Sequence, residues 1–284
     1  MEMLKKIIIV MIVVAGIIAL VTYGYLLMSH YATVDYNLNL LKNPENLKNS
    51  QNFREIPKIL NQTYHMPDKI PNKVRENIKQ YASDYELKIY NDKEGKEFIE
   101  KYFIDAVAEK YNELTGAHKA DLLRYCLLYI NGGIYFDIKT ELIKPLSSLV
   151  KDRESVTGKP IIYLVNSLHG PKTVYNGFMA SPAKQKFFLD LINFIVQKSS
   201  LLPAFYYTYF IKNAYKQLKK NLLADDIKQG YNAGKKNDYY VLEEVTSKNA
   251  KNCPDGLDRY KLCSWIMEGN EKAVKTRYSD YPWS

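Results

Sequence analysis

A group of charged residues interrupts the most apolar part of the sequence. The stretch KADLLRYCLLYINGGIYFDIKT covers residues 119–140, and Asp121, Arg124 and Asp137 stand there among apolar and aromatic side chains. Charged side chains are rarely buried unless something pairs with them or uses them. Asp121 and Arg124 are three positions apart, so they share one face of a helix. One interpretation is an intrahelical ion pair, which adds little net stability in a buried helix. The other, which we favour, is a polar site that faces a ligand.

A helix and a strand must position these side chains. Residues 117–130 predict a helix that is apolar nearly all round and therefore largely buried. Asn131, Gly132 and Gly133 end this helix, and the glycines allow a tight return into a strand that finishes near Asp137. In open α/β sheets, ligands bind beyond the carboxyl ends of the strands. Asp137 is therefore expected at the same site as the helix pair.

The rest of the pattern predicts one α/β domain. Strands are expected within residues 56–64, 85–90, 134–138, 161–167, 175–181 and 239–245. Helices are expected within residues 73–82, 96–114, 117–130, 183–198 and 206–223. Strands that alternate with helices are typical of an α/β fold. We therefore predict an α/β domain with a mostly parallel sheet over residues 55–284.

The first thirty residues have a different character. Lys5 and Lys6 precede a mostly apolar run without charge over residues 7–28. A helix of roughly 22 residues is about 33 Å long, enough to cross a bilayer. We therefore expect a cytoplasmic tip and an uncleaved transmembrane signal anchor in residues 1–30, and a stalk in residues 31–54. The chain would be a single-pass membrane protein with a cytoplasmic N-terminus and a lumenal or extracytoplasmic domain, in the Golgi or endoplasmic reticulum if the source is eukaryotic or viral.

The composition is that of a globular protein with an excess of positive charge. Hydrophobic residues make up 46% of the chain and charged residues 25%, which excludes a disordered or fibrous protein. The net charge of +9 and the pI near 9.1 suit an anionic ligand or an anionic membrane surface. No nucleic-acid partner is expected, because no stripe of Lys and Arg is interleaved with aromatic residues and no helix-turn-helix or zinc-finger spacing occurs.

Three segments resemble the DXD-containing sugar glycosyltransferase family. They are IPKILNQTYH (residues 56–65), KADLLRYCLLYINGGIYFDIKTELIKPL (119–146) and NGFMAS (176–181). The family includes initiation-type mannosyltransferases and capsular-polysaccharide sugar transferases. The resemblance implies a GT-A (Rossmann-like) fold and transfer of a hexose, such as mannose, galactose or glucose, with retention at the anomeric carbon. It implies a UDP- or GDP-hexose donor and a glycan, glycolipid or glycoprotein acceptor.

The resemblance also implies roles for single residues. It assigns donor binding to Tyr64, Asp121, Arg124, Tyr135 and Asn176. Tyr64 stands where the family usually has a tryptophan stacked on the nucleotide base, and Asn176 falls in a loop that contacts a sugar. Asp137 matches the first carboxylate of the DXD motif.

Lys139 departs from the family pattern, which has a second acid at this position. That acid usually binds Mn²⁺, and an ammonium group cannot bind a cation. On an extended strand Lys139 lies on the same face as Asp137, unless the strand has already ended and Lys139 points to solvent. Lys139 then acts with Asp137 in catalysis by neutralising the diphosphate leaving group, or a metal remains on Asp137 with oxygen from Glu141 or Asp280. A third possibility is an inactive carbohydrate-binding or scaffold protein that keeps the fold.

Overall fold

The computed structural model describes residues 11, 14–19, 21, 39–42, 54–151, 155–167, 172–197, 206–247 and 263–278. The chain divides into two units, Met1–Asn39 and Leu40–Ser284. Among the described residues, we find no helix with the length and apolar character needed to cross a membrane. Most of the expected anchor, most of the expected stalk and Asp280 lie outside the described residues. The anchor and the stalk therefore stay predictions.

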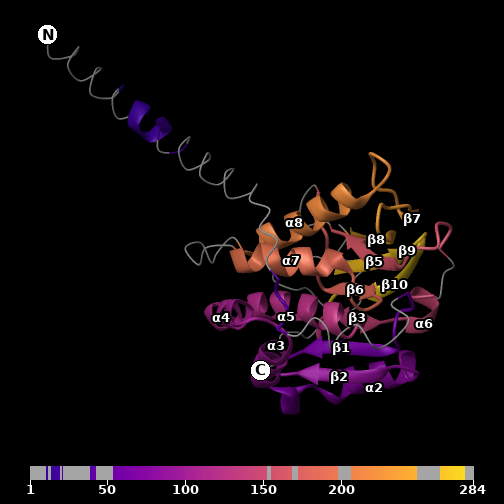
Figure 1. Cartoon of the computed structure of the whole chain (residues 1–284). Helices are drawn as coiled ribbons and strands as arrows, with labels where there is room; N and C mark the ends of the chain where they lie inside the picture. The colour runs from indigo at the N-terminus through magenta and orange to yellow at the C-terminus, as the bar shows by residue number, and fades with distance from the viewer. Residues whose placement is uncertain are drawn as a thin grey trace, which may run out of the picture. The chain divides into compact units, whose positions relative to one another are not determined.

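A ten-stranded sheet forms the middle of the second unit (Figure 1). Within the described residues its order is β2-β1-β3-β6-β5-β8-β9-β10-β4, and β7 pairs with β8 beside this row. The strands are β1 (Ile59–Thr63), β2 (Glu86–Tyr90), β3 (Gly133–Phe136), β4 (Glu141–Leu142), β5 (Ile161–Asn166), β6 (Phe178–Ser181), β7 (Gly230–Asn232), β8 (Asp238–Ser247), β9 (Cys263–Glu268) and β10 (Glu271–Lys275). An α/β fold is therefore confirmed.

The sheet is mixed, so the prediction of a mostly parallel sheet is wrong. Among the described strands, the pairs β1–β2, β1–β3 and β5–β8 are parallel, and the other six pairs are antiparallel. Part of the reason is a hairpin that the sequence pattern did not reveal. Gly269 and Asn270 alone join β9 to β10, and so short a connection joins only antiparallel strands. β6 adds two further antiparallel pairs, because it runs against both β3 and β5.

Helices cover both faces of the sheet. One face packs against α3 (Asp92–Tyr102), α4 (Asp105–Glu113), α5 (Ala117–Ile130), α7 (Lys186–Gln197) and α8 (Tyr206–Asn221). The other packs against α2 (Asn72–Tyr81) and α6 (Leu146–Leu149), and a short 3-10 helix, η2 (Pro67–Lys69), precedes α2. β3 serves both cores, since Tyr135 points to the first while Ile134 and Phe136 point to the second.

The helix predicted for residues 96–114 is two helices in the structure. α3 ends and α4 begins around Phe103 and Ile104, whose ψ angles of 158° and 161° are extended rather than helical. Phe103 is fully buried and belongs to the same core as α5. Burial of this ring therefore explains the break, which an apolar pattern of helical period could not reveal.

The return from α5 into β3 depends on two glycines. Gly132 and Gly133 have φ angles of +68° and +85°, in the region that side chains other than glycine rarely adopt. A Cβ on Gly133 would lie 2.4 Å from the carbonyl oxygen of Ile59, so β1 and β3 approach too closely for any side chain here. The predicted tight return is confirmed, and it holds the end of α5 against β3.

Strand directions bring the predicted polar residues to one edge of the sheet. β1 is parallel to β3, and β6 runs antiparallel to both β3 and β5. The carboxyl ends of β1, β3 and β5 therefore share an edge with the start of β6. Asp137 directly follows β3 and Asn176 shortly precedes β6, so both lie at this edge.

Candidate active site

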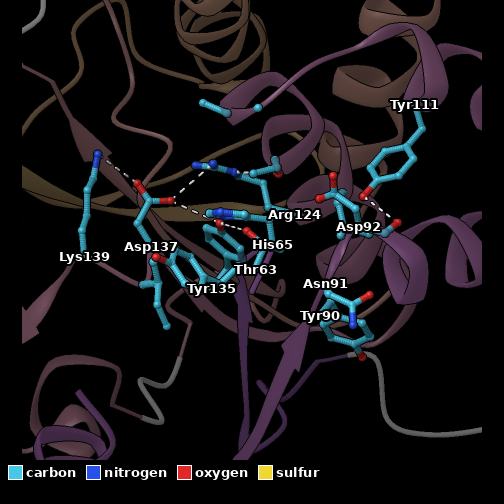
Figure 2. A pocket seen from close by; sticks show the side chains of 16 residues that line it. Thr63, His65, Tyr90, Asn91, Asp92, Tyr111, Arg124, Tyr135, Asp137 and Lys139 are labelled. Atoms are coloured by element: carbon cyan, nitrogen blue, oxygen red, sulfur yellow. Dashed lines mark hydrogen bonds and ion pairs between the residues drawn. The ribbon is translucent and has the colours of Figure 1, made fainter. Parts of the chain in front are cut away.

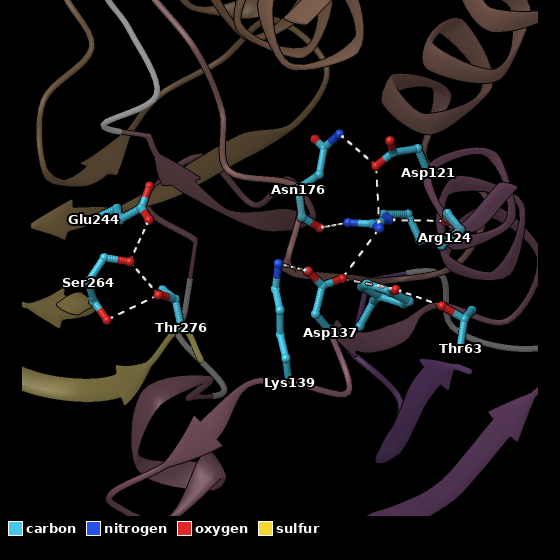
Figure 3. A network of polar contacts seen from close by, with 11 residues as sticks. Thr63, Asp121, Arg124, Asp137, Lys139, Asn176, Glu244, Ser264 and Thr276 are labelled. Atoms are coloured by element: carbon cyan, nitrogen blue, oxygen red, sulfur yellow. Dashed lines mark hydrogen bonds and ion pairs between the residues drawn. The ribbon is translucent and has the colours of Figure 1, made fainter. Parts of the chain in front are cut away.

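Arg124 is the centre of the polar network at this edge (Figure 3). Its guanidinium lies 3.3 Å from Asp121 Oδ1 and 3.3 Å from Asp137 Oδ1. It also donates a 2.6 Å hydrogen bond to the backbone carbonyl of Asn176. Arg124 is only 4% exposed and Asp121 only 1%. The helix pair therefore reaches the strand end, and it is more than an isolated intrahelical ion pair.

Tyr135 supports both Arg124 and Asp137. The guanidinium carbon lies 4.6 Å from the centre of the Tyr135 ring, within the range of a cation–π contact. The phenol donates a 3.2 Å hydrogen bond to Asp137 Oδ1, and its oxygen lies 3.0 Å from the hydroxyl of Thr63. Strands β1 and β3 thus fix the Asp137 carboxylate from one side.

Asn176 connects the network to the start of β6. Its side-chain oxygen accepts a 2.9 Å hydrogen bond from the Tyr125 hydroxyl, and its amide lies 3.3 Å from Asp121 Oδ1. The neighbouring Gly177 carbonyl accepts a 2.9 Å hydrogen bond from the Asp137 backbone N–H. Asn176 therefore contacts α5 and adjoins the end of β3.

One oxygen of Asp121 stands out because it is buried without a hydrogen bond. Asp121 Oδ2 accepts none from any described residue. His118 Nδ1 is 3.6 Å away, slightly beyond hydrogen-bond distance. A buried carboxylate oxygen without a donor is costly and calls for a partner. A hydroxyl group of a bound ligand is the kind of donor that this oxygen lacks.

Lys139 lies beside Asp137, but the strand alternation is not what brings it there. β3 ends at Phe136, and the next residues form a turn in which the Thr140 N–H donates a 2.8 Å hydrogen bond to the Asp137 carbonyl. The turn directs the Lys139 ammonium to 3.4 Å from Asp137 Oδ2. The carbonyl of Lys139 accepts a hydrogen bond from the Tyr278 N–H, so the chain after β10 holds this turn.

Burial and neighbouring charges shift the pKa values of Asp137 and Arg124. Burial alone would raise the pKa of Asp137, but Arg124 and Lys139 outweigh it and lower that pKa below its usual range. Burial likewise disfavours the charged form of Arg124, yet Tyr135 and the two carboxylates raise its pKa further. The carboxylate of Asp137 is therefore held in its ionised form between Arg124 and Lys139.

The network forms one wall of a cleft of about 320 Å³ (Figure 2). The cleft is lined by Thr63, Tyr64, His65, Tyr90, Asn91, Asp92, Tyr111, Gly116, Ala117, Ala120, Leu123, Arg124, Tyr135, Asp137, Ile138 and Lys139. Five of the predicted site residues, namely Tyr64, Arg124, Tyr135, Asp137 and Lys139, are among them. Asp121 and Asn176 lie behind this wall, in contact with Arg124. Tyr64 lines the cleft, as a residue that stacks on a ligand ring must.

Sequence reasoning missed several residues of the site. Thr63 and Tyr125 hold Tyr135 and Asn176 through hydroxyl groups. Asp92 lines the cleft where β2 gives way to α3, and the Tyr111 hydroxyl donates a 3.3 Å hydrogen bond to its carbonyl. The signal for Thr63 and Asp92 was present, since each lies at or just beyond the carboxyl end of a parallel strand.

Comparison with known proteins finds a family that this region resembles. Residues 25–156 match the model for the glycosyltransferase sugar-binding region containing the DXD motif. This part of the chain is similar to the DXD glycosyltransferase family. The matched region contains Tyr64, Asp121, Arg124 and Asp137, whereas Asn176 lies outside it.

Two known proteins are similar to parts of this chain. The initiation-specific alpha-1,6-mannosyltransferase of Saccharomyces cerevisiae is 35% identical over 78 residues, which are 26% of this chain and 16% of that protein. The match thus spans only a small part of the relative's length. The solved structure of the PaToxG glycosyltransferase has a TM-score of 0.38 and 15% identity, over 58% of this chain and 69% of that one.

The DXD region does not fit a divalent cation with its described residues alone. The family usually binds such a cation, but here Asp137 meets Arg124 at one oxygen and Lys139 at the other. Glu141 is turned to Lys275, 3.5 Å away. Among the described residues, no group of three or more His, Cys, Asp or Glu could hold a metal ion. Asp280 lies outside the described residues, so its predicted role as a ligand stays open.

Proposed function

We propose that the protein transfers a hexose from a UDP- or GDP-sugar to a glycan, glycolipid or glycoprotein, with retention at the anomeric carbon. The observation that carries this proposal is the buried Arg124, which contacts Asp121 and Asp137 at the carboxyl edge of the sheet, on the wall of a cleft. The match of residues 25–156 to the DXD family model supports the reaction class. The small share of the yeast relative that is matched leaves the sugar and the acceptor to experiment.

Donor recognition follows from the arrangement of the cleft. The unsatisfied Asp121 Oδ2 suits a sugar or ribose hydroxyl as donor, provided that the ligand reaches past Ala120 and Arg124. The Arg124 guanidinium already contacts four oxygens of the described residues, so we expect it to orient the two carboxylates and to contribute positive potential. Tyr64 offers an aromatic face at the cleft for the nucleotide base, which is a common way to hold a planar ring.

The chemistry needs little acid–base assistance. The bond from the anomeric carbon to the diphosphate breaks, a bond from the acceptor oxygen to the same face forms, and the acceptor proton passes to the leaving diphosphate. Negative charge that develops on the diphosphate must be stabilised by groups already in place. Lys139 is suited to this, since it lines the cleft and its side chain is 34% exposed. At an effective dielectric of about 20, one charge pair at 4 Å is worth roughly 4 kcal/mol before desolvation.

The position of the domain in the cell is part of the proposal. The apolar run of residues 7–28 supports a single-pass anchor with a cytoplasmic N-terminus and a lumenal or extracytoplasmic domain. Full-length protein should then remain with membranes after alkaline carbonate washing, and its C-terminus should resist protease in sealed vesicles. Release of the protein by carbonate would contradict the anchor without touching the reaction.

A second function, sugar binding without catalysis, is favoured by one observation. Lys139 replaces the second acid of the motif and pairs with Asp137, so one of the acids that usually bind the cation is missing. Incubation of the full chain with a panel of UDP- and GDP-hexoses separates the two functions. Release of nucleoside diphosphate, with a product whose anomeric configuration is read by NMR, supports transfer. Saturable binding of one donor, without hydrolysis or transfer to any acceptor tried, supports the binding protein.

A further inference from the structure

A second hollow in the Leu40–Ser284 unit is lined almost entirely by lysines. It has a volume of about 620 Å³ and lies along α8. Its lining residues are Lys172, Lys212, Tyr215, Lys216, Lys219 and Lys220, which we call the α8 lysine hollow. Within the described part of the chain, no Asp or Glu contributes to this lining. The hollow is distinct from the cleft, because the two share no lining residue.

The lysines are not needed to hold α8 in place. Phe210, Ala214 and Leu218 attach the helix to the core and are at most 1% exposed. Lys212 and Lys216 are exposed and one helical turn apart, so they lie together on the face away from the core. An amphipathic helix needs a polar outer face, but a face of one charge sign is not required for packing.

Concentrated like charge is unfavourable unless an anion is near. Lysines at i and i+4 repel each other, and this repulsion opposes the fold. Asp225 lies 3.9 Å from Lys219, but its side chain is fully exposed, so screening makes this pair weak. The hollow therefore presents a strong positive potential in a concave surface, which raises the local concentration of anionic groups.

We propose that the α8 lysine hollow docks the phosphate groups of an anionic lipid bilayer. Tyr215 is an amphipathic ring within the lysines, of the kind that lies at a membrane interface. Leu223, just beyond the end of α8, is a large apolar side chain that is 63% exposed. Basic residues beside exposed apolar ones are typical of surfaces that lie on anionic membranes. Single-stranded nucleic acid fits less well, because the described residues of the lining include a single aromatic ring for stacking.

One segment of the chain connects the α8 lysine hollow to the polar network of the cleft. Lys172 and Asn176 lie on the same segment between β5 and β6, and the Val174 N–H on this segment donates a 3.1 Å hydrogen bond to the Ile211 carbonyl of α8. A bilayer at the hollow therefore lies against the segment that contacts Arg124. A bilayer in this position would present a lipid-linked acceptor near the cleft. That role rests on the proposed function, whereas the docking itself does not.

Acylation of lysines, read by mass spectrometry, tests the docking on the full chain. The protein is incubated with vesicles of phosphatidylcholine alone, or of phosphatidylcholine mixed with phosphatidylserine, and then labelled briefly. Lys212 and Lys216 should react about tenfold more slowly on the anionic vesicles only, and added salt should reverse this protection. Lys93 and Lys96 on α3 are the matched controls, since both side chains are exposed and should react equally on either vesicle.

Substitutions that reverse the charge of two lysines of the hollow provide a second test of the docking. Combined Lys212→Glu and Lys216→Glu substitutions should remove the protection of Lys172 on anionic vesicles and leave donor turnover in detergent unchanged. Equal labelling of the hollow on both vesicle types would overturn the proposal, as would equal protection of the α8 and α3 lysines. Stronger protection by an oligonucleotide or by inorganic pyrophosphate than by the anionic vesicles would assign the hollow to a soluble polyanion instead.

Discussion

Arg124 donates a 2.6 Å hydrogen bond to the backbone carbonyl of Asn176, which lies 52 positions further along the chain. This bond joins α5 to the start of β6, while the same guanidinium contacts the carboxylates of Asp121 and Asp137. Arg124 is therefore a structural connection as well as a candidate ligand contact. Truncation and conservative replacement at this position should have different consequences.

Arg124→Ala should lower the free energy of unfolding by about 3–5 kcal/mol, because it leaves the buried Asp121 carboxylate without its cation and leaves Asp137 with Lys139 alone. Arg124→Lys keeps the charge but loses the planar fork and the contact with Tyr135. We expect that variant to fold and to lose more than about tenfold in donor turnover, equivalent to about 1.4 kcal/mol. Urea unfolding and turnover assays measure the two effects. Arg75→Lys is the control, since Arg75 reaches only an exposed carbonyl contact with Pro67.

Asp121→Asn tests the oxygen that has no hydrogen-bond donor. The amide has nearly the same shape but no charge, so it weakens both the contact with Arg124 and the acceptance of a ligand hydroxyl. Donor affinity should fall by at least about tenfold, or 1.4 kcal/mol, as measured by isothermal titration calorimetry. Asp84→Asn, at an exposed pair with Lys58, should leave affinity unchanged. If the Asp121→Asn variant binds the donor as tightly as the wild type, Asp121 is not part of the donor site.

The site shows what local sequence can and cannot reveal. The apolar pattern of α5 and the two glycines after it were enough to predict that Asp121, Arg124 and Asp137 converge. The hydroxyl contacts of Thr63 and Tyr125 were not predictable, because they depend on distances across 72 and 51 residues of sequence. Tertiary contacts of this kind leave no periodic signal.

The strands likewise include some that the local sequence reveals and some that it does not. Strands with long apolar runs, such as β5 and β3, were found because they are buried on both faces. β10 has the sequence EKAVK with its first two residues exposed, so its pattern is too short and too charged to predict a strand. β4 has only two residues and exists because it pairs with β10. These strands at the far edge of the sheet, together with the central strand β6, turned an expected parallel sheet into a mixed one.

Asp137 should make stability depend on pH in the acid range. Burial alone would raise its pKa, but Arg124 and Lys139 hold that pKa below the ordinary value of 3.8. The folded protein therefore binds this proton less readily than the unfolded chain does. The stabilisation is present above about pH 3.8 and is lost as pH falls towards the depressed pKa. The difference in unfolding free energy between wild type and Asp137→Asn, from urea titrations at about pH 6 and about pH 3, should shrink at the lower pH. A constant difference would contradict the depressed pKa.

Gly133→Ala should destabilise the protein through contact as well as through conformation. The residue has φ of +85°, and its new Cβ would lie 2.4 Å from the Ile59 carbonyl oxygen. Gly158→Ala is a matched control, because Gly158 has φ of +71° but no atom of a described residue within 4 Å of its Cβ position. The control should cost about 1–2 kcal/mol for the left-handed conformation alone. A larger loss of unfolding free energy at position 133, measured by urea titration, isolates the clash between β1 and β3. Equal losses would contradict it.

Substitutions of Lys139 test whether the positive charge at the diphosphate comes from the protein or from a metal ion. Its ammonium lies 3.4 Å from Asp137 Oδ2 and faces the cleft. Lys139→Met keeps the length of the side chain and removes the charge, so turnover should fall by at least about a hundredfold, or 2.7 kcal/mol. Lys88→Met is the control, since Lys88 is half-buried like Lys139 and pairs with the exposed Glu86. EDTA should have little effect on the wild type if the ammonium replaces the cation.

Lys139→Asp is the sharpest test, because it restores the family's motif. The change places a second carboxylate next to Asp137 and removes the Lys139 ammonium. Arg124 is then the cation that balances these carboxylates and Asp121. The site therefore becomes more negative and attracts a hard cation. Turnover of this variant should be low in EDTA and rise with Mn²⁺, whereas the wild type should respond to neither. The readout is the ratio of turnover with Mn²⁺ to turnover with EDTA, taken for wild type and variant side by side. If EDTA abolishes wild-type turnover, Mn²⁺ restores it and Lys139→Met is tolerated, the cation uses ligands beyond the described residues. If Lys139→Asp leaves both turnover and the ratio unchanged, Lys139 does not act at the diphosphate.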